Sequence, residues 1–317
     1  MITVILHLIS KQRDVIYVMK EIKPNSLAAW ISGSRPKTLV AALIPVAIGS
    51  SLAYADGKFN GWLTLICALF ACLMQIAANL INDFYDYVKG VDKKNRVGPE
   101  RALAQGWITP KAMKRGIAGI LLAACVAGSC LLFHGGWELL FVGAFCFLFA
   151  YLYTGGPYPL SYYGAGDFLV VIFFGFVPVC GTYYVQTLTL TVDVWIASLV
   201  SGLTVNTMLI INNYRDRNTD RESNKRTLIV RLGEPFGRYF YLLTGVASSL
   251  LCLWFFGGGH FYAALLPQIY LIFHFMTWRK MVRIYAGKAL NITFGETARN
   301  MLLMGLLLSA GWLLEGF

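Results

Sequence analysis

The sequence predicts an all-α protein, a polytopic membrane bundle of about nine transmembrane helices. Of its 317 residues, 57% are hydrophobic and 14% are charged, and the mean hydropathy is +0.60. A soluble domain carries about 25% charged residues, so the composition indicates a membrane protein. A helix that crosses a bilayer needs roughly 20 mostly apolar residues. Nine stretches fit, at 38–55, 62–81, 115–133, 137–153, 167–186, 194–212, 239–256, 261–278 and 298–315. The count depends most on residues 115–153, where the joining turn is only "HGG".

Basic residues predict the orientation of these helices. Of the 27 lysines and arginines, all except Lys58 fall on one side of the predicted bundle, in the N-terminal arm and in the loops after spans two, six and eight. The positive-inside rule makes that side cytoplasmic, with the N-terminus inside. The net charge of +11 is thereby explained by topology and membrane lipids, and no nucleic-acid partner is expected. We assign residues 1–34 to a cytoplasmic or interfacial arm and residues 35–317 to the transmembrane domain.

Two polar runs end predicted spans and repeat each other. Asn82 and Asp86 in "NDFYDYVKGVD" (82–92) match Asn212 and Asp216 in "NNYRDRNTDRESNKRTLIVRLGE" (212–234). Helical spacing places Asp83 and Asp86 on one face of the first helix, and Asn212, Asp216 and Asp220 on one face of the second. Repeats of this kind in membrane proteins commonly form a site between the two halves. We therefore expect both oxygen-rich faces to point at one cavity on the cytoplasmic side.

The chemistry of these runs has two interpretations. Helix ends that meet water are often polar, and each run alone fits that role equally well. However, an aspartate inside the bilayer costs about 2.5–3.5 kcal/mol on insertion scales, and the pattern occurs twice, each copy followed by lysines and arginines. Carboxylates and asparagine carbonyls suit Mg²⁺, and basic side chains suit phosphate oxygens. The repeat therefore favours a metal-bridged diphosphate site at the membrane surface.

The apolar remainder predicts a second substrate-binding region. Residues 141–176 are dense in Phe and Tyr. Most aromatic residues in membrane spans pack or lie at interfaces. As a group, these rings could line a tunnel for an isoprenoid tail and stabilise a carbocation through their negative faces. The seven cysteines all fall in predicted spans without a C-x-x-C pair, which argues against disulfides or a zinc site.

These residues also carry a resemblance to a known family. The motifs "RPKTLVAALIPV" (35–46), "NDFYDYVKGVD", "RVGPERALAQGWIT" (96–109), "GAGD" (164–167) and the second run resemble the UbiA superfamily of intramembrane prenyltransferases, most closely its dihydroxynaphthoate branch. The resemblance implies a nine-helix bundle around a central cavity, with Mg²⁺ as cofactor. It implies metal binding by Asn82, Asp83, Asp86, Asp216 and Asp220, and diphosphate or substrate binding by Lys89, Arg101, Asn212, Lys225 and Arg226.

The sequence departs from the family at two places. Many relatives carry a Y-x-x-x-K motif after span four, whereas here Tyr153 begins "YTGGP" and the loop has no basic residue. Tyr153 remains an expected substrate contact, and the missing lysine favours the naphthoate branch. The second departure is that Asp92 follows Asp86 by six residues rather than four, so we do not assign it to the metal. Asp167 is interpreted either as the N-cap of span five or as a residue that orients or deprotonates the acceptor.

The predicted function is Mg²⁺-dependent transfer of a polyprenyl chain from polyprenyl diphosphate to 1,4-dihydroxy-2-naphthoate, with loss of CO₂, in a cytoplasmic membrane. Catalysis is assigned to Asp83, Asp86, Asp216 and Asp220. Related enzymes with another acceptor, such as 4-hydroxybenzoate, homogentisate or haem, are the nearest alternatives. A transporter of an anionic or lipid-linked substrate is a further alternative, although transporters keep such polar residues near the midplane. Chain length and oligomeric state are not encoded in these patterns.

Overall fold

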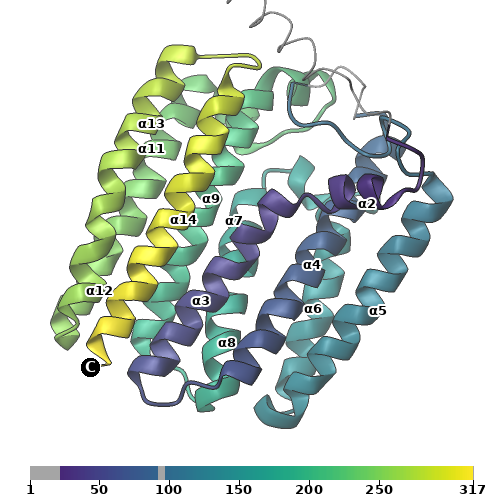
Figure 1. Ribbon diagram of the computed structural model, residues 1–317. Helices are drawn as coiled ribbons and strands as arrows, with labels where there is room; N and C mark the ends of the chain where they lie inside the picture. The colour runs from purple at the N-terminus through teal and green to yellow at the C-terminus, as the bar shows by residue number, and fades with distance from the viewer. Residues whose placement is uncertain (1–21, 92–96, 317) are drawn as a thin grey trace, which may run out of the picture.

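The computed structural model describes residues 22–91 and 97–316, and in these residues all the regular secondary structure is helical, without strands (Figure 1). The all-α prediction is confirmed. The longer helices are α2 Leu27–Ser34, α3 Leu39–Ala55, α4 Gly61–Val88, α5 Pro110–Gly135, α6 Glu138–Leu152, α8 Val177–Thr187, α9 Val192–Glu222, α11 Glu234–Leu251, α13 Tyr270–Ile284 and α14 Leu290–Glu315. The shorter ones are η1 Pro36–Thr38, η2 Leu160–Tyr162, α7 Gly166–Val171, η3 Ile172–Phe176, α10 Leu228–Leu232, η4 Cys252–Gly258, α12 Phe261–Leu265 and η5 Leu266–Ile269.

The expected number of spans agrees approximately with the structure. Within the described residues, eight helical segments are long and apolar enough to cross a membrane. The predicted fourth span corresponds to α6, which is apolar but has only 15 residues. At 1.5 Å per residue it is about 22 Å long, shorter than the roughly 30 Å hydrocarbon core. Several of the eight are composite, since α7, η3 and α8 form one segment, Gly166–Thr187.

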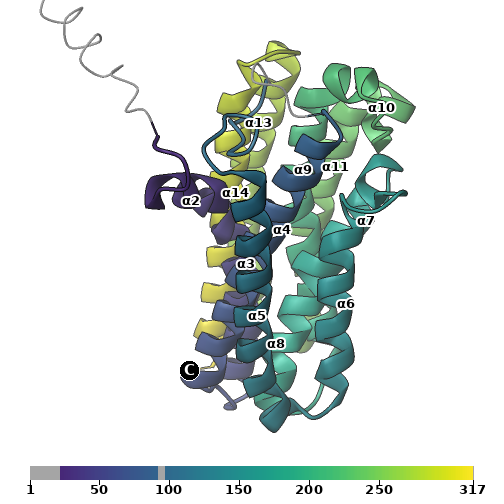
Figure 2. The same cartoon turned by 90° about the vertical axis from the view of Figure 1, so that its right-hand side faces the viewer.

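The long helices lie side by side and form a single elongated bundle (Figures 1 and 2). Helix α2 lies across one end of it, and the C-terminus lies at the other end. Helix α2 belongs to the arm predicted for residues 1–34, and its N-cap Ser26 accepts a hydrogen bond from the backbone of Ala29. The expectation that the first residues are interfacial falls outside the described residues.

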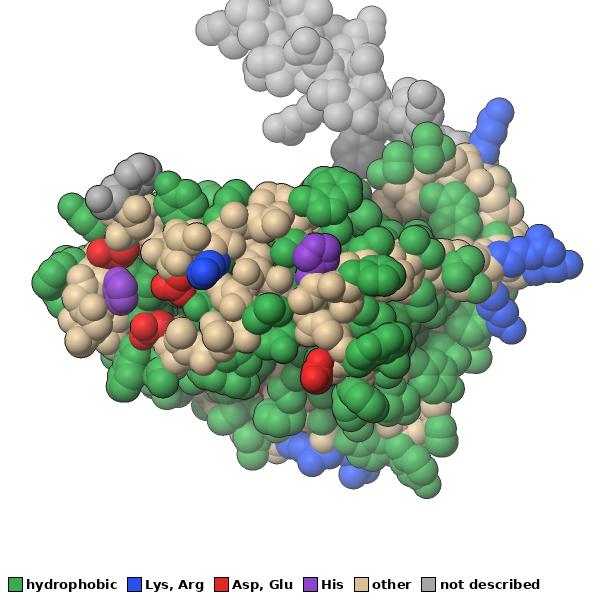
Figure 3. Space-filling view, turned by 90° about the horizontal axis from the view of Figure 1, so that it is seen from below, with side chains coloured by type: hydrophobic (Ala, Val, Ile, Leu, Met, Phe, Trp, Pro, Cys, Tyr) green, Lys and Arg blue, Asp and Glu red, His purple; other side chains and the backbone are tan. Residues whose placement is uncertain are grey.

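The two ends of the bundle differ in charge. Seen from the end that carries the C-terminus, the helix ends facing the viewer are mainly hydrophobic or uncharged, with scattered acidic, histidine and basic side chains (Figure 3). Asp83, Asp86, Asp216 and Asp220 instead lie near the C-terminal ends of α4 and α9, at the end where α2 lies. The carboxylates of both runs therefore lie at the same end of the bundle, as the repeat predicted.

Two glycines bring the composite fifth span against α9. Segment η3 is a single turn of π-helix, and a Cβ added at Gly175 within it would stand 2.3 Å from the Ser198 carbonyl oxygen. On the facing helix, a Cβ at Gly202 would stand 2.7 Å from the Val171 carbonyl oxygen. Real side chains do not fit at such distances, so the two backbones touch. This contact fixes the height of α7 relative to α9.

Candidate active site

The first polar run forms the last turns of α4, and its side chains have separate partners. Asn79, one turn earlier, donates to the Ser34 carbonyl oxygen (3.0 Å) and to Thr38 Oγ1 (2.9 Å), so it holds the junction before α3. Asn82 Oδ1 accepts a hydrogen bond from Thr154 Oγ1 at 2.6 Å. Asp86 Oδ1 accepts one from the Tyr162 hydroxyl at 3.0 Å. The run is therefore an organised, largely buried surface rather than a frayed helix end.

Asp83 connects this surface to the following loop. Its Oδ2 accepts a hydrogen bond from the backbone N–H of Ala102 at 2.9 Å, in a buried position. The loop residue just before this anchor is Arg101, one of the predicted diphosphate ligands. Ala102 also packs with Leu103 and Ile108 against α4 in a small apolar cluster. Asp83 therefore positions Arg101 through the backbone of its neighbour.

The second polar run lies on the last turns of α9 and is organised by an arginine that the sequence did not assign to the site. Arg215 pairs with Asp216 through two hydrogen bonds of 2.7 Å, Nε to Oδ1 and Nη2 to Oδ2. Its Nη2 also donates to Asn212 Oδ1 (2.6 Å), and its Nη1 donates to Asn291 Oδ1 (3.1 Å). The Asn291 amide in turn donates to the Val97 carbonyl oxygen (3.1 Å). Arg215 thus ties two predicted site residues to α14 and the loop after α4.

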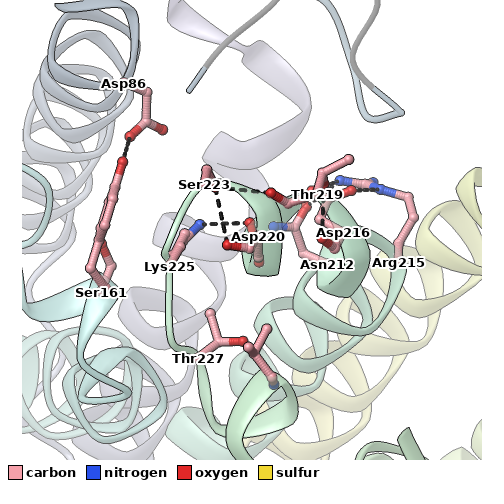
Figure 4. Close-up of polar contacts among 12 residues, drawn as sticks. Asp86, Ser161, Asn212, Arg215, Asp216, Thr219, Asp220, Ser223, Lys225 and Thr227 are labelled. Carbon is pink, nitrogen blue, oxygen red and sulfur yellow. Dashed lines mark hydrogen bonds and ion pairs between the residues drawn. The ribbon is translucent and has the colours of Figure 1, made fainter. Parts of the chain in front are cut away.

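Asp220, on the last turns of α9, has one carboxylate oxygen that no described side chain or backbone group satisfies. Its Oδ1 lies 3.6 Å from Lys225 Nζ, and its buried Oδ2 has no hydrogen-bond partner among the described residues. Figure 4 shows Lys225 and Asp220 between Asp86 on one side and Asp216 with Arg215 on the other. The carboxylates of Asp86 and Asp216 interact electrostatically with that of Asp220. The two runs therefore converge, as the repeat predicted.

Tyr162, in the loop before α7, lies between the two runs. Besides donating to Asp86, its ring has Lys89 Nζ at 5.0 Å and Lys225 Nζ at 5.8 Å from the centroid. Its carbonyl oxygen accepts a hydrogen bond from the Arg226 backbone N–H at 2.9 Å. Cations over aromatic faces are attracted by the ring quadrupole. Tyr162 thus contacts two predicted phosphate-binding lysines as well as Asp86.

A polar pocket of about 450 Å³ adjoins this loop. It is lined by Lys89, Arg226, Arg231, Tyr162 and neighbouring loop residues. Lys89 Nζ donates to the Thr154 carbonyl oxygen at 2.7 Å. Burial lowers the pKa of Lys89, and the charge of Asp86 partly opposes that shift. The structure thus brings Lys89 and Arg226 to one pocket.

An apolar cavity of about 720 Å³ extends from the polar end into the bundle. Helices α3, α4, α5, α6, α7 and α8 line it, with rings that include Phe70, Phe147, Phe149, Phe173 and Phe174. The predicted central cavity is therefore present. Asn82 and Tyr153 line it too, although almost all other lining residues are apolar. The cavity therefore begins at the first polar run.

Tyr153 is partly buried and lies near three carboxylates. Burial raises its pKa, and the negative charges of Asp167, Asp86 and Asp220 raise it further. Its hydroxyl lies 3.3 Å from the position of a Cβ at Gly166, so the absence of a side chain there leaves it room. The structure thus places Tyr153 where the cavity meets both polar runs. A neutral phenol in this position can donate one hydrogen bond.

Asp167 is not the N-cap of the fifth span. Helix α7 begins at Gly166 with Ala165 as its N-cap, and no side chain caps it. Asp167 lies inside the first turn and is buried, beside the side chain of Asn206 on α9. The N-cap interpretation is therefore wrong. The chain turns into the helix earlier than expected, within "GAGD".

Several organising residues were missed by sequence reasoning. Arg215, Tyr162, Thr154 and Asn206 all contact or adjoin predicted site residues. Arg215 was counted only among the basic residues that predict topology. Asn206 is a single amide within a predicted span, so no motif marked it. Asp92 lies outside the described residues. Within residues 22–91 and 97–316, no three His, Cys, Asp or Glu side chains are grouped to hold a metal ion by themselves.

Comparison with known proteins places this site in a family. The UbiA prenyltransferase family matches residues 42–314. The chain is 38% identical over 243 residues to 1,4-dihydroxy-2-naphthoate octaprenyltransferase of Escherichia coli (strain K12), covering 74% of this chain and 78% of that protein. The protein of the same name from Bacillus subtilis (strain 168) is 28% identical over 292 residues, covering 90% and 92%.

Solved structures show the same fold. A UbiA homolog from Archaeoglobus fulgidus bound to DMAPP and Mg²⁺ superposes with a TM-score of 0.64 at 13% identity, covering 88% of this chain and 99% of that one. Helices, polar end and cavity thus define a class of integral membrane enzyme. The chain belongs to the UbiA prenyltransferase family and is a membrane prenyltransferase.

Proposed function

We propose that this enzyme transfers a polyprenyl chain from polyprenyl diphosphate to 1,4-dihydroxy-2-naphthoate, with release of diphosphate and CO₂. The product is the hydroquinone form of demethylmenaquinone. The observation that carries the proposal is the junction of the convergent carboxylates with the 720 Å³ apolar cavity. A diphosphate needs cations, and an isoprenoid chain needs an apolar cavity. The acceptor follows from relatives named for the dihydroxynaphthoate reaction.

We assign Mg²⁺ to the oxygen donors of the two runs, Asn82, Asp83, Asp86, Asp216 and Asp220. The residues fit the ion because the donors are carboxylate and amide oxygens, and because Asp220 Oδ2 is buried without a hydrogen-bond partner. Mg²⁺ characteristically takes one or two carboxylates and completes its shell with water and substrate phosphate. A Mg²⁺ site therefore does not need three acidic side chains grouped around one point. When bound, Mg²⁺ neutralises diphosphate charge that develops as the C–O bond breaks.

The basic side chains hold the diphosphate in this proposal. Lys89 and Arg226 line the 450 Å³ pocket, and Lys225 lies beside Asp220. Arg101 is positioned through Asp83, and Asn212 through Arg215. Charge-assisted hydrogen bonds from these groups stabilise the leaving group in a partly desolvated site. The isoprenoid chain lies in the apolar cavity, and Tyr153 contacts substrate at its entrance.

The orientation proposed from the basic loops makes the polar end cytoplasmic. From that side the water-soluble aromatic acid can enter the site, and the diphosphate product can leave it, through the aqueous phase. A transporter is disfavoured because the charged groups lie at helix ends rather than near the midplane. A related acceptor such as 4-hydroxybenzoate is the second candidate, and the product distinguishes it.

The test is an assay of the purified protein in lipid nanodiscs with octaprenyl diphosphate, Mg²⁺ and each aromatic acid in turn. Mass spectrometry should find prenylated product only with dihydroxynaphthoate, together with released CO₂. Asp220→Asn, which preserves shape and leaves Asp83 and the Arg215–Asp216 pair intact, should lower kcat by at least about 100-fold. Asp193→Asn, at the opposite end of α9, is the matched control. Prenylated hydroxybenzoate alone would overturn the acceptor, and full Asp220→Asn activity would overturn the site.

A further inference from the structure

Below the two polar runs lies a buried polar pair that neither the metal nor the diphosphate needs. Asp167 is in the first turn of α7, and Asn206 faces it from α9. One oxygen of each, Asp167 Oδ1 and Asn206 Oδ1, is buried without a hydrogen-bond partner among the described residues. The residues themselves are 7% and 2% exposed, so bulk solvent does not reach these oxygens. Buried polar atoms are nearly always paired, so two adjacent exceptions require an explanation.

The pair stands where the polar end meets the apolar cavity. Asn206, Asn213 and Asp220 recur every seven residues and therefore share one face of α9, which leads down from the carboxylates. Leu169 and Val170, on the turn that follows Asp167, line the cavity. Tyr153 lies between, since it lines the cavity and interacts with both Asp167 and Asp220. If the Tyr153 side chain adopted another rotamer, Asp167 and Asn206 would become accessible from the cavity.

This boundary is where the reaction must occur. In the proposed function the diphosphate lies among the cations and the isoprenoid chain lies in the cavity. The carbon that joins them therefore lies at the junction, and the aromatic ring must reach it. A dihydroxy aromatic acid brings two O–H donors, whereas the two unpartnered oxygens behind Tyr153 are both acceptors. Donor and acceptor groups therefore match in type and number.

We propose that Asp167 and Asn206 form the subsite that binds the ring hydroxyls of the acceptor. Asp167 Oδ1 accepts a hydrogen bond from one hydroxyl, and Asn206 Oδ1 accepts one from the other. The inference rests on the proposed function and adds the means by which the enzyme selects a dihydroxy acceptor. A site built to bind a hydroxyl group rejects an analogue that lacks it, because its buried polar groups are then left unpaired.

The test separates binding of hydroxyls from support of the fold. Asp167→Leu and Asn206→Leu are nearly isosteric and remove the accepting oxygens, and Asp167→Ala and Asn206→Ala are smaller changes for use if a leucine variant does not fold. Each variant is assayed for the KM of dihydroxynaphthoate, the KM of the prenyl donor, and the inhibition constant of 2-naphthoate. That inhibitor keeps the carboxylate and both rings but has no hydroxyl. Asp193→Asn is again the control.

We expect the acceptor kcat/KM to fall roughly 10- to 100-fold in the variants, as for an unpaired buried group. The donor KM and the 2-naphthoate inhibition constant should stay within about twofold, because neither ligand uses these oxygens. An unchanged acceptor kcat/KM would overturn the subsite. Equal losses for both naphthoates would overturn it too, by showing a structural role. Wild-type protein that does not prenylate dihydroxynaphthoate would instead overturn the proposed function.

Discussion

Removal of the Arg215 side chain should destabilise the protein as well as inactivate it. The guanidinium is 0% exposed, and its partner Asp216 is 11% exposed, so solvent screens their interaction little. Arg215→Leu would leave Asp216 as a buried charge without its two 2.7 Å hydrogen bonds, and would also release Asn212 and Asn291. Breaking a buried pair from one side costs about 3–5 kcal/mol. The expected loss of stability is of that size.

The measurement is the free energy of unfolding in mixed micelles for a double-mutant cycle of Arg215→Leu, Asp216→Asn and the double variant. Because most of the loss comes from a buried carboxylate that has lost two hydrogen bonds, Asp216→Asn should restore part of the stability when Arg215 is already absent. Lys280→Ala is the matched control. Lys280 and Glu296 are 41% and 24% exposed, so breaking this surface pair should cost less than about 1 kcal/mol.

The reasoning is refuted if Arg215→Leu unfolds with the wild-type free energy. It is also refuted if the double variant is no more stable than Arg215→Leu, because the buried carboxylate would then not be the source of the loss. Activity gives an independent check. If Arg215 only supports Asp216 and Asn212, its loss should reduce kcat while the donor chain-length preference stays unchanged.

Three further predictions concern the charged end and the cavity. Burial lowers the pKa of Lys89, so its charge is present below that pKa and is lost as the pH rises through it. Lys89→Arg should therefore move the alkaline limb of the pH profile of kcat/KM to higher pH. An unchanged alkaline limb would show that another group titrates there. Tyr162→Phe removes the 3.0 Å hydrogen bond to Asp86 and should lower kcat/KM about 5- to 10-fold, with no effect if Tyr162 merely packs. A Cβ at Gly181 would meet nothing within 4 Å and the residue lines the cavity, so Gly181→Leu should reduce transfer from octaprenyl diphosphate more than from geranyl diphosphate. Gly119→Leu on α5 also meets open space but does not line the cavity, and equal effects from both would contradict the cavity assignment.

The sequence predicts the bundle well because membrane insertion imposes a simple rule on composition. Long apolar runs appear as helices, and polar residues that repeat at helical spacing mark the ends that converge. The predicted span that agrees least well with the structure is α6, because its apolar helix is only 15 residues long. The convergence of Asp86, Asp216 and Asp220 also followed from the repeat.

The contacts that organise the site could not be predicted in the same way. Arg215 and Asp216 are adjacent, and neighbours along a helix do not ordinarily face each other. Their pairing depends on a long side chain folding back within a packed interior. The contacts of Tyr162 and Thr154 depend on loop conformation, which tertiary packing decides. Asp167 was misplaced because its helix begins within a glycine-rich turn, where the local sequence gives no N-cap signal.

The contact between Gly175 and Gly202 has a consequence for where the reaction occurs. Since the two backbones touch, α7 cannot slide along α9, and the depth of Asp167 below Asp220 is set by the chain itself rather than by the lipid. A slip of one helical turn would shift one relative to the other by about 5.4 Å, more than a hydrogen bond can span. Bilayers of different thickness should therefore change how far the whole bundle protrudes, while the spacing between leaving group and acceptor stays constant.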